Sequence, residues 1–93
     1  MKVVYRPRAL QDLDDIADYY QTFAASTALK VLADIDEVIE LLEVQPRSGR
    51  EIVPGVRRNV SKTYRYVLLS RIEGDVVAIL QIYRNPNRSP EFA

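Results

Sequence analysis

The apolar positions of this chain change their spacing from a helical to an extended period about halfway along. Up to residue 44, apolar residues recur every three or four positions in two stretches, which places them on one side of a helix. From residue 56 onwards, apolar and polar residues approach the alternation that is typical of strands. Two turn sequences, Pro46–Gly49 and Pro54-Gly55, separate these stretches. The pattern therefore predicts a helical half joined to a half made of strands.

The first half predicts one short strand and two helices. Residues 2–6 are rich in β-branched and aromatic side chains and predict a strand. A helix is expected over about residues 7–23, and a second one from Ser26, whose hydroxyl suits an N-cap, to about residue 44. Pro46 ends the second helix because proline disfavours helical backbone at the preceding residue. Two amphipathic helices joined by a short turn are expected to form an antiparallel hairpin.

The second half predicts three strands, over residues 56–61, 64–71 and 75–84. Gly74 lies in the tight turn before the last strand, at a position that needs a positive φ. The expected fold class is α+β, with the helical hairpin packed on one face of a small, mainly antiparallel sheet in the order β-α-α-β-β-β. All 93 residues are assigned to a single domain, of which residues 84–93 form a polar C-terminal tail.

The last two predicted strands are apolar on both faces near their middle. Strict alternation assigns to the faces of the last strand Val77, Ile79 and Tyr83 on one side, and Val76, Ala78, Leu80 and Ile82 on the other. A helical pair can cover only one face of a sheet. We therefore expect a partner, the C-terminal tail or a second copy over the other face, unless the strands twist enough to bury it internally or it stays an exposed apolar patch.

The composition excludes several kinds of chemistry. The chain has no histidine and no cysteine, so it lacks the commonest general base, the commonest zinc ligand and any thiolate nucleophile. It has no long apolar run and no signal sequence, so we expect no membrane span and a cytoplasmic location. Asp12, Asp15, Asp34 and Glu37 could be imagined as metal ligands, but without histidine beside them we expect no metal site and no cofactor.

A formal net charge of zero hides a separation of charge along the chain. Residues 9–45 carry nine acids and one lysine, for a net charge of −8. Residues 46–93 carry nine bases and four acids, for a net charge of +5, and residues 1–8 add three bases. A basic second half can face an acidic protein or a nucleic acid. The overall pI of 6.2 argues against a protein that coats DNA regardless of sequence.

The candidate binding residues are the basic and aromatic side chains of the second half. They are Arg57, Arg58, Lys62, Tyr64, Arg65, Tyr83, Arg84 and Arg88. For Arg57 and Arg58, charge that protects an edge strand from pairing with other chains is an equal alternative. For Tyr64, packing in the core is the simpler interpretation. Tyr83 and Arg84, at the end of the last strand, are favoured for a functional role, whereas the acids of the helices are interpreted as a solvated face.

Several segments, taken in order, resemble a known family of toxins. They are Tyr5-Arg6-Pro7-Arg8-Ala9, the run from Asp12 to Tyr19, Pro46 to Arg50, Gly55 to Arg58, Tyr66 to Leu69, and Val77 to Arg84. Together they cover about residues 2–88 and resemble the ParE branch of the RelE/ParE toxin superfamily. The fold of that family, a strand and two helices followed by three strands, is the one that the periodicity predicts independently.

The resemblance implies the toxin of a type II toxin–antitoxin pair, often called a plasmid stabilisation protein. Such toxins are expected to inhibit DNA gyrase and block replication, and a ParD-like antitoxin neutralises them with a C-terminal segment that wraps around the toxin. Operator DNA would then be bound only through the antitoxin. Family members often carry a histidine near the end of the last strand, where this chain has Tyr83.

A RelE-like ribosome-dependent mRNA endonuclease is the enzymatic alternative. Its chemistry needs a base for the 2′-hydroxyl, an acid for the leaving oxygen and cations for the charge on phosphorus. Arg58, Tyr83 and Arg84 could supply the cations and the tyrosine, but the base would have to be Lys62 or a glutamate. We therefore favour a toxin that is not an enzyme. A third alternative is a non-toxic family member that acts only in autoregulation with its antitoxin.

Overall fold

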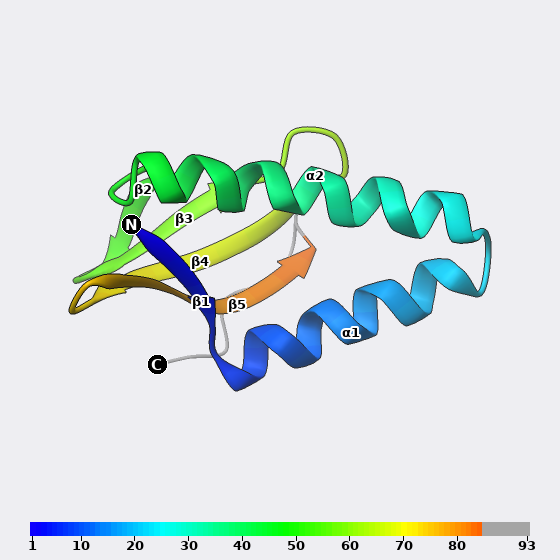
Figure 1. Ribbon diagram of the computed structural model, residues 1–93, viewed down its shortest axis with the longest axis horizontal. Helices are drawn as coiled ribbons and strands as arrows, with labels where there is room; N and C mark the ends of the chain where they lie inside the picture. The colour runs from blue at the N-terminus through cyan, green and yellow to red at the C-terminus, as the bar shows by residue number, and fades with distance from the viewer. Residues whose placement is uncertain (85–93) are drawn as a thin grey trace.

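The computed structural model describes residues 1–84, which form two helices and five strands (Figure 1). The elements are β1 (Lys2–Tyr5), α1 (Pro7–Gln21), α2 (Ala25–Val44), β2 (Arg50–Val53), β3 (Val56–Val60), β4 (Tyr66–Glu73) and β5 (Val76–Arg84). The strands make one sheet in the order β1-β5-β4-β3-β2, in which β1 runs parallel to β5 and every other pair is antiparallel. The predicted α+β class with a mainly antiparallel sheet is confirmed. The observed order is β-α-α-β-β-β-β, with one strand more than predicted.

The strand that the sequence pattern missed is β2, which lies in the region predicted as turns. It pairs with β3 through the Pro54-Gly55 turn, and it begins directly after Gly49. Gly49 has φ +94°, and a Cβ atom there would lie 2.4 Å from the carbonyl oxygen of Arg58. Only glycine fits this close approach. Four residues between two turns are too few for a strand period to stand out.

The two helices form the predicted antiparallel hairpin, with small differences at its tip. α1 ends at Gln21 and not near residue 23. α2 begins at Ala25 with Ala24 as its N-cap, so the predicted N-cap at Ser26 is wrong. The chain already turns at Ala24, whose carbonyl accepts the N–H of Ala28, and Ser26 therefore lies inside the first turn. Neither helix is long and apolar enough to cross a membrane, as judged over residues 1–84.

The main core lies between the helices and one face of the sheet, as Figure 1 shows. It contains the apolar stripes of both helices and the inward side chains of β4 and β5. Its buried members include Ile16, Tyr20, Val31, Ile35, Leu42, Tyr66, Leu68, Val77, Ile79 and Ile82. The N-terminal ammonium donates a hydrogen bond to the carbonyl of Glu43, 2.6 Å away, and holds β1 beside the end of α2.

A β-bulge interrupts the pairing of β4 with β5. Gln81 pairs with Leu69, whereas Ile79 pairs with the next residue of β4, so Leu80 has no partner. An extra residue reverses the alternation of side chains beyond it. The N–H of Ile82, two residues after the bulged position, donates instead to a carboxylate oxygen of Asp12 on α1, at 2.8 Å.

The bulge corrects the predicted faces of the last strand. Ile82 belongs to the main core under the helices, together with Val77 and Ile79. Tyr83 packs against the opposite face of the sheet. The predicted grouping of Tyr83 with Val77 and Ile79 is therefore wrong, because strict alternation does not continue through Leu80.

The face of the sheet away from the helices carries a second apolar cluster. Val56, Val67 and Leu69 are at most 4% exposed, and Ile52, Val60, Leu80 and Tyr83 surround them as partly buried side chains. The centre of this face is thus buried within one chain. The centre of the cluster is therefore not an exposed patch, and its partly buried margin leaves a covering partner or second copy as a prediction.

Asp34 of α2 is buried, with 5% of its surface exposed, although the sequence pattern assigned the helix acids to a solvated face. Its carboxylate accepts hydrogen bonds from the backbone N–H groups of Thr63 and Tyr64, at 3.1 and 2.7 Å. These groups belong to the loop between β3 and β4, where no neighbouring strand can accept their hydrogen bonds. Asp34 therefore fixes this loop against the second helix.

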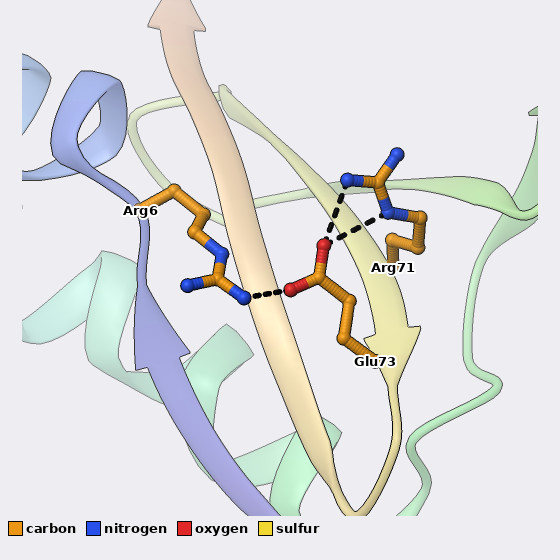
Figure 2. Close-up of polar contacts among 3 residues, drawn as sticks. All are labelled: Arg6, Arg71 and Glu73. Carbon is orange, nitrogen blue, oxygen red and sulfur yellow. Dashed lines mark hydrogen bonds and ion pairs between the residues drawn. The ribbon is translucent and has the colours of Figure 1, made fainter.

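A partly exposed ion network joins the end of β1 to β4 on the face of the sheet away from the helices. Figure 2 shows the carboxylate of Glu73 on β4 between Arg6, which follows β1, and Arg71 on β4 itself. Nε and Nη2 of Arg71 donate to Oε2 of Glu73 at 3.0 and 2.7 Å. The hydrogen bonds from Arg6 and then Arg71 lower the pKa of Glu73. The network spans β5 and ties the parallel edge strand to the antiparallel part of the sheet.

We predict that Asp34→Asn lowers the free energy of unfolding at pH 7 by ~1–2 kcal/mol, because charged acceptors make the stronger hydrogen bonds. Burial alone would raise the pKa of Asp34, but hydrogen bonds from Tyr64, Ser61 and Thr63 outweigh it and lower the pKa below 3.8. A lowered pKa in the folded state stabilises the protein above pH 3.8, and this contribution is lost as the pH falls through the folded pKa.

The measurement is denaturant unfolding of both proteins between pH 7 and pH 2.5. The stability difference should stay constant down to about pH 5 and shrink at lower pH. Asp36→Asn, at an exposed position of the same helix, is the matched control and should change stability by at most ~0.5 kcal/mol. Equal losses in both variants would contradict the anchoring role of Asp34.

Candidate functional site

The structure divides the predicted site residues among three places. They are the β3–β4 loop with Lys62, Tyr64 and Arg65, the strand β3 with Arg57 and Arg58, and the end of β5 with Tyr83 and Arg84. Arg88 lies outside the described residues. These groups do not share one surface, because neighbouring residues of a strand point to opposite faces of the sheet.

Arg57 and Arg58 lie on opposite faces of β3. Arg58 follows Val56 and precedes Val60 on the face away from the helices, as the alternation predicts. Arg57 lies on the other face, and its Nη1 donates to the carbonyl of Gly49 at 2.9 Å. Arg57 also lines a polar cavity of about 340 Å³ together with Arg47 and Glu51. Arg57 thus has a structural contact with the turn before β2.

The loop between β3 and β4 holds Tyr64 in place. β4 begins at Tyr66, so the predicted strand start at Tyr64 is wrong. Ser61 and Tyr66 close the loop, since the Ser61 hydroxyl accepts the N–H of Tyr66 at 2.8 Å and the N–H of Ser61 donates to the Tyr66 carbonyl at 2.7 Å. Arg65 has φ +62°, a left-handed conformation that non-glycine residues adopt in turns. The carboxylate of Asp34 accepts the N–H of Tyr64 within this loop. The loop therefore places Tyr64 beside the helices.

Tyr83 and Arg84 point in opposite directions at the end of β5. Tyr83 pairs with Val67 and packs against the second cluster, on the same face as Arg58. Arg84 pairs with Tyr66 and lies on the helix face, where its Nη1 donates to the hydroxyl of Tyr20 at 3.2 Å. Sequence neighbours that were predicted to act together are therefore separated by the sheet.

Arg84 and Tyr64 meet at a cleft of about 360 Å³ near the tip of the helical hairpin. We call this the aromatic cleft; its lining residues are Tyr19, Tyr20, Phe23, Thr27, Tyr64 and Arg84. The rings of Tyr19 and Tyr20, and those of Tyr19 and Phe23, contact edge to face with centroids 5.0 Å apart. Tyr20 also contacts Tyr64, at 6.3 Å. Such ring pairs hold the walls of the cleft in a defined arrangement.

The outer wall of the aromatic cleft is exposed to solvent. Tyr19 is 56% exposed and Phe23 is 68% exposed, which is high for large apolar side chains that lie side by side. Contiguous exposed apolar surface rimmed by polar groups is typical of a binding site. Arg84 is exposed at the rim and is the one charged side chain among the described residues that line the cleft.

The hydroxyl of Tyr20 connects the polar groups on one side of the cleft, which we call the polar wall. It accepts hydrogen bonds from Nη1 of Arg84 and, in the buried direction, from the hydroxyl of Tyr66 at 3.4 Å. A hydroxyl that accepts twice still has its own hydrogen to donate. The polar wall therefore offers donors, the Tyr20 O–H and the remaining guanidinium N–H groups, and suits a ligand that accepts hydrogen bonds.

Burial raises the pKa of Tyr66 well above its ordinary value of 10.0, and the hydrogen bond to Tyr20 raises it further. The charge of Arg84 acts in the opposite direction but does not cancel this effect. Tyr66 therefore stays protonated at neutral pH, and it cannot serve as a general base there.

Three of the four carboxylates that were considered as metal ligands have other contacts. Asp12 and Asp34 accept backbone N–H groups, and Asp15 accepts the side-chain amide of Gln11 at 2.9 Å. Over residues 1–84, the acidic side chains do not form any group of three or more that could hold a metal ion.

The sequence pattern missed the helix residues of the cleft. Tyr19, Tyr20 and Phe23 all lie in the helix predicted over residues 7–23, and none of them was among the predicted site residues. The signal that could have found them is the cluster of three aromatic residues, Tyr19, Tyr20 and Phe23, at the end of the predicted first helix, where the apolar stripe has room for only one of them.

Comparison with known families gives one match over most of the chain. A family described as "ParE toxin of type II toxin-antitoxin system, parDE" matches residues 3–85. The search of curated proteins gives no match at a significant level.

Comparison with solved structures gives matches of similar extent. The chain is similar to a protein of the chromosomal ParDE TA system from P. aeruginosa, with 32% identity, a TM-score of 0.77, and coverage of 90% of this chain and 95% of the other. A chain of the intact E. coli RelBE toxin-antitoxin complex has 14% identity and a TM-score of 0.58, with 92% and 98% covered. At that identity the second match shows a shared fold only.

We predict that Tyr66→Phe removes a strongly alkaline tyrosine ionisation from the folded protein. A raised pKa favours the neutral form in the folded state, so the contribution to stability is complete below pH 10 and is lost as the pH rises further. The measurement is an ultraviolet titration of phenolate absorbance from pH 8 to pH 13. In Tyr83→Phe, the control, the alkaline component should remain. An unchanged alkaline component in Tyr66→Phe would contradict the assignment.

Proposed function

The chain belongs to the ParE toxin family of type II toxin–antitoxin systems, and from this membership we propose that it inhibits DNA gyrase and blocks replication until a ParD-like antitoxin binds it. The observation that carries the proposal is the family match over residues 3–85. The solved ParDE system at 32% identity supports an antitoxin of the ParD type as the partner. Gyrase acts in the cytoplasm, which is the location we propose for this protein. Operator DNA would be bound through the antitoxin.

The chemistry of the aromatic cleft supports binding in preference to catalysis. Among the described residues, its polar groups are the donors of Arg84, Tyr20 and Tyr64 and the hydroxyl of Thr27. Tyr66, which lies behind Tyr20, has a raised pKa. These described side chains can hold and orient an acceptor group, and they include no carboxylate or imidazole that could serve as a base.

The RelE-like alternative needs Arg58, Tyr83 and Arg84 to act on one phosphate. Arg58 and Tyr83 share the face of the sheet away from the helices, whereas Arg84 contacts Tyr20 on the helix face. Residues on opposite faces of a sheet cannot contact the same group without rearrangement. This separation disfavours an mRNA endonuclease built from these residues.

We further propose that the basic and aromatic residues on both faces bind the antitoxin or the target. On the helix face these are Tyr64 and Arg84, with Lys62 and Arg65 exposed on the adjoining loop. On the other face they are Arg58 and Tyr83. Arg57 belongs to the proposed set as well, although its hydrogen bond to the Gly49 carbonyl also gives it a structural role at the turn before β2. Arg88 completes the proposed set.

The proposed function predicts growth arrest with DNA-damage signalling when the chain is expressed alone. In vitro, the purified protein should inhibit supercoiling by gyrase and accumulate gyrase–DNA cleavage complexes. Adding the ParD-like protein encoded by the neighbouring reading frame in equimolar amount should abolish both effects. The control is gyrase incubated with that antitoxin alone. If gyrase is unaffected while ribosome-bound mRNA is cut, the endonuclease alternative replaces the proposal. If neither target is affected and growth continues, the chain acts in autoregulation only.

A further inference from the structure

We propose that the aromatic cleft binds a short antitoxin segment through one large apolar side chain and one carboxylate next to it in that segment. The proposal rests on the proposed function, because the antitoxin is its partner. It goes further by assigning a place on the toxin and the chemistry of the residue pair that fills it.

The carboxylate is inferred from the polar wall of the cleft. Arg84 is exposed and uses its Nη1 on the Tyr20 hydroxyl at 3.2 Å. A guanidinium has five N–H donors in a planar fork, so a pair of donors stays available for a carboxylate. The hydroxyl of Tyr20 accepts from Arg84 and Tyr66 and keeps its own hydrogen. Both groups therefore favour an anionic acceptor, and the contact with Tyr20 fixes the direction of the guanidinium.

The apolar side chain is inferred from the opposite wall. Phe23 and Tyr19 are 68% and 56% exposed, and their edge-to-face contact keeps both rings beside the cleft. Covering them with an apolar group would remove their ring surfaces from water, which is the main source of affinity at interface anchors. A volume of about 360 Å³ is at the small end of the range for ligand pockets. It suits one side chain and its neighbour.

A peptide fits the charges around the cleft better than a nucleic acid strand does. Single-stranded nucleic acid needs a groove of several cations that follows its backbone. Among the described residues, one cation lines the cleft, and the helical hairpin that borders it belongs to a segment with a net charge of −8. Asp18 is exposed on α1, one residue before Tyr19. Repulsion from these acids grows with each phosphate, whereas a peptide with one carboxylate meets it once.

Asp34 positions one wall of the cleft without contacting its occupant. Its carboxylate accepts the N–H of Tyr64 at 2.7 Å and so determines where the Tyr64 ring lies relative to Tyr20. The cleft is therefore supported from α2 and not only from the strands that it borders.

The experiment measures the affinity of the full-length toxin for the antitoxin from the neighbouring reading frame by calorimetry. Phe23→Ala and Arg84→Gln should each weaken binding by at least about 10-fold, as expected for anchor residues. The matched controls are Leu10→Ala, at a 51% exposed position of α1, and Arg47→Gln, an exposed cation next to the distant polar cavity. Each control should change the affinity by less than about 3-fold. Thermal unfolding of all four variants confirms that they are folded.

A double-mutant cycle tests the carboxylate itself. Each aspartate of the antitoxin segment is replaced by asparagine, and each glutamate by glutamine, and binding is measured to wild-type toxin and to Arg84→Gln. One replacement should weaken binding to the wild-type toxin by about 10-fold and have little further effect in Arg84→Gln. Fully additive effects for every carboxylate would overturn the pairing with Arg84.

The remaining outcomes separate this inference from the proposed function. Tight binding that Phe23→Ala and Arg84→Gln leave unchanged overturns the cleft as the docking place and leaves the antitoxin partnership intact. A wild-type toxin that does not bind the antitoxin overturns the proposed function. A fluorescent single-stranded oligonucleotide that binds the wild-type toxin, and binds both cleft variants more weakly, overturns the peptide as the occupant.

Discussion

Backbone N–H groups that leave a sheet ladder and lose their contact with water must find another acceptor, and here two helix carboxylates provide it. Asp12 of α1 accepts the N–H of Ile82 just after the β-bulge. Asp34 of α2 accepts the N–H groups of Thr63 and Tyr64 in the β3–β4 loop. Each helix thus docks on the sheet through one carboxylate as well as through its apolar stripe. The irregular parts of the sheet and the positions of the helices depend on each other.

This coupling decides which side chains form the aromatic cleft. Because Leu80 is an extra residue, Arg84 comes to lie on the helix face and Tyr83 on the other. The loop held by Asp34 brings Tyr64 to the same place. The cleft therefore combines residues from a helix end, a loop and a strand end that no single sequence segment contains. Its cation and its Tyr64 wall are both consequences of departures from regular strand geometry.

Periodicity predicted the two helices, the last three strands and the α+β class, because those features depend on long stretches of repeated side-chain spacing. It missed β2, whose four residues are too few to show a period, and it placed the start of β4 two residues early because Tyr64 continues the alternation in sequence while lying in a turn. Periodicity could not predict the bulge at Leu80, because the extra residue is visible only in how the last strand pairs with Leu69 and Ser70. Of the predicted site, Tyr64 and Arg84 meet. Tyr20 was hidden because its ring packs in the core while its hydroxyl reaches the cleft.

The charge is separated between the helical layer and the sheet, and this gives the molecule an electric dipole moment despite its zero net charge. The helical layer carries most of the negative charge, and the segment that forms the last four strands carries a net positive charge. In the field of a charged partner, such a molecule experiences little net force but a strong torque. It therefore approaches in a preferred orientation, and added salt slows its association even though its overall charge predicts no such dependence.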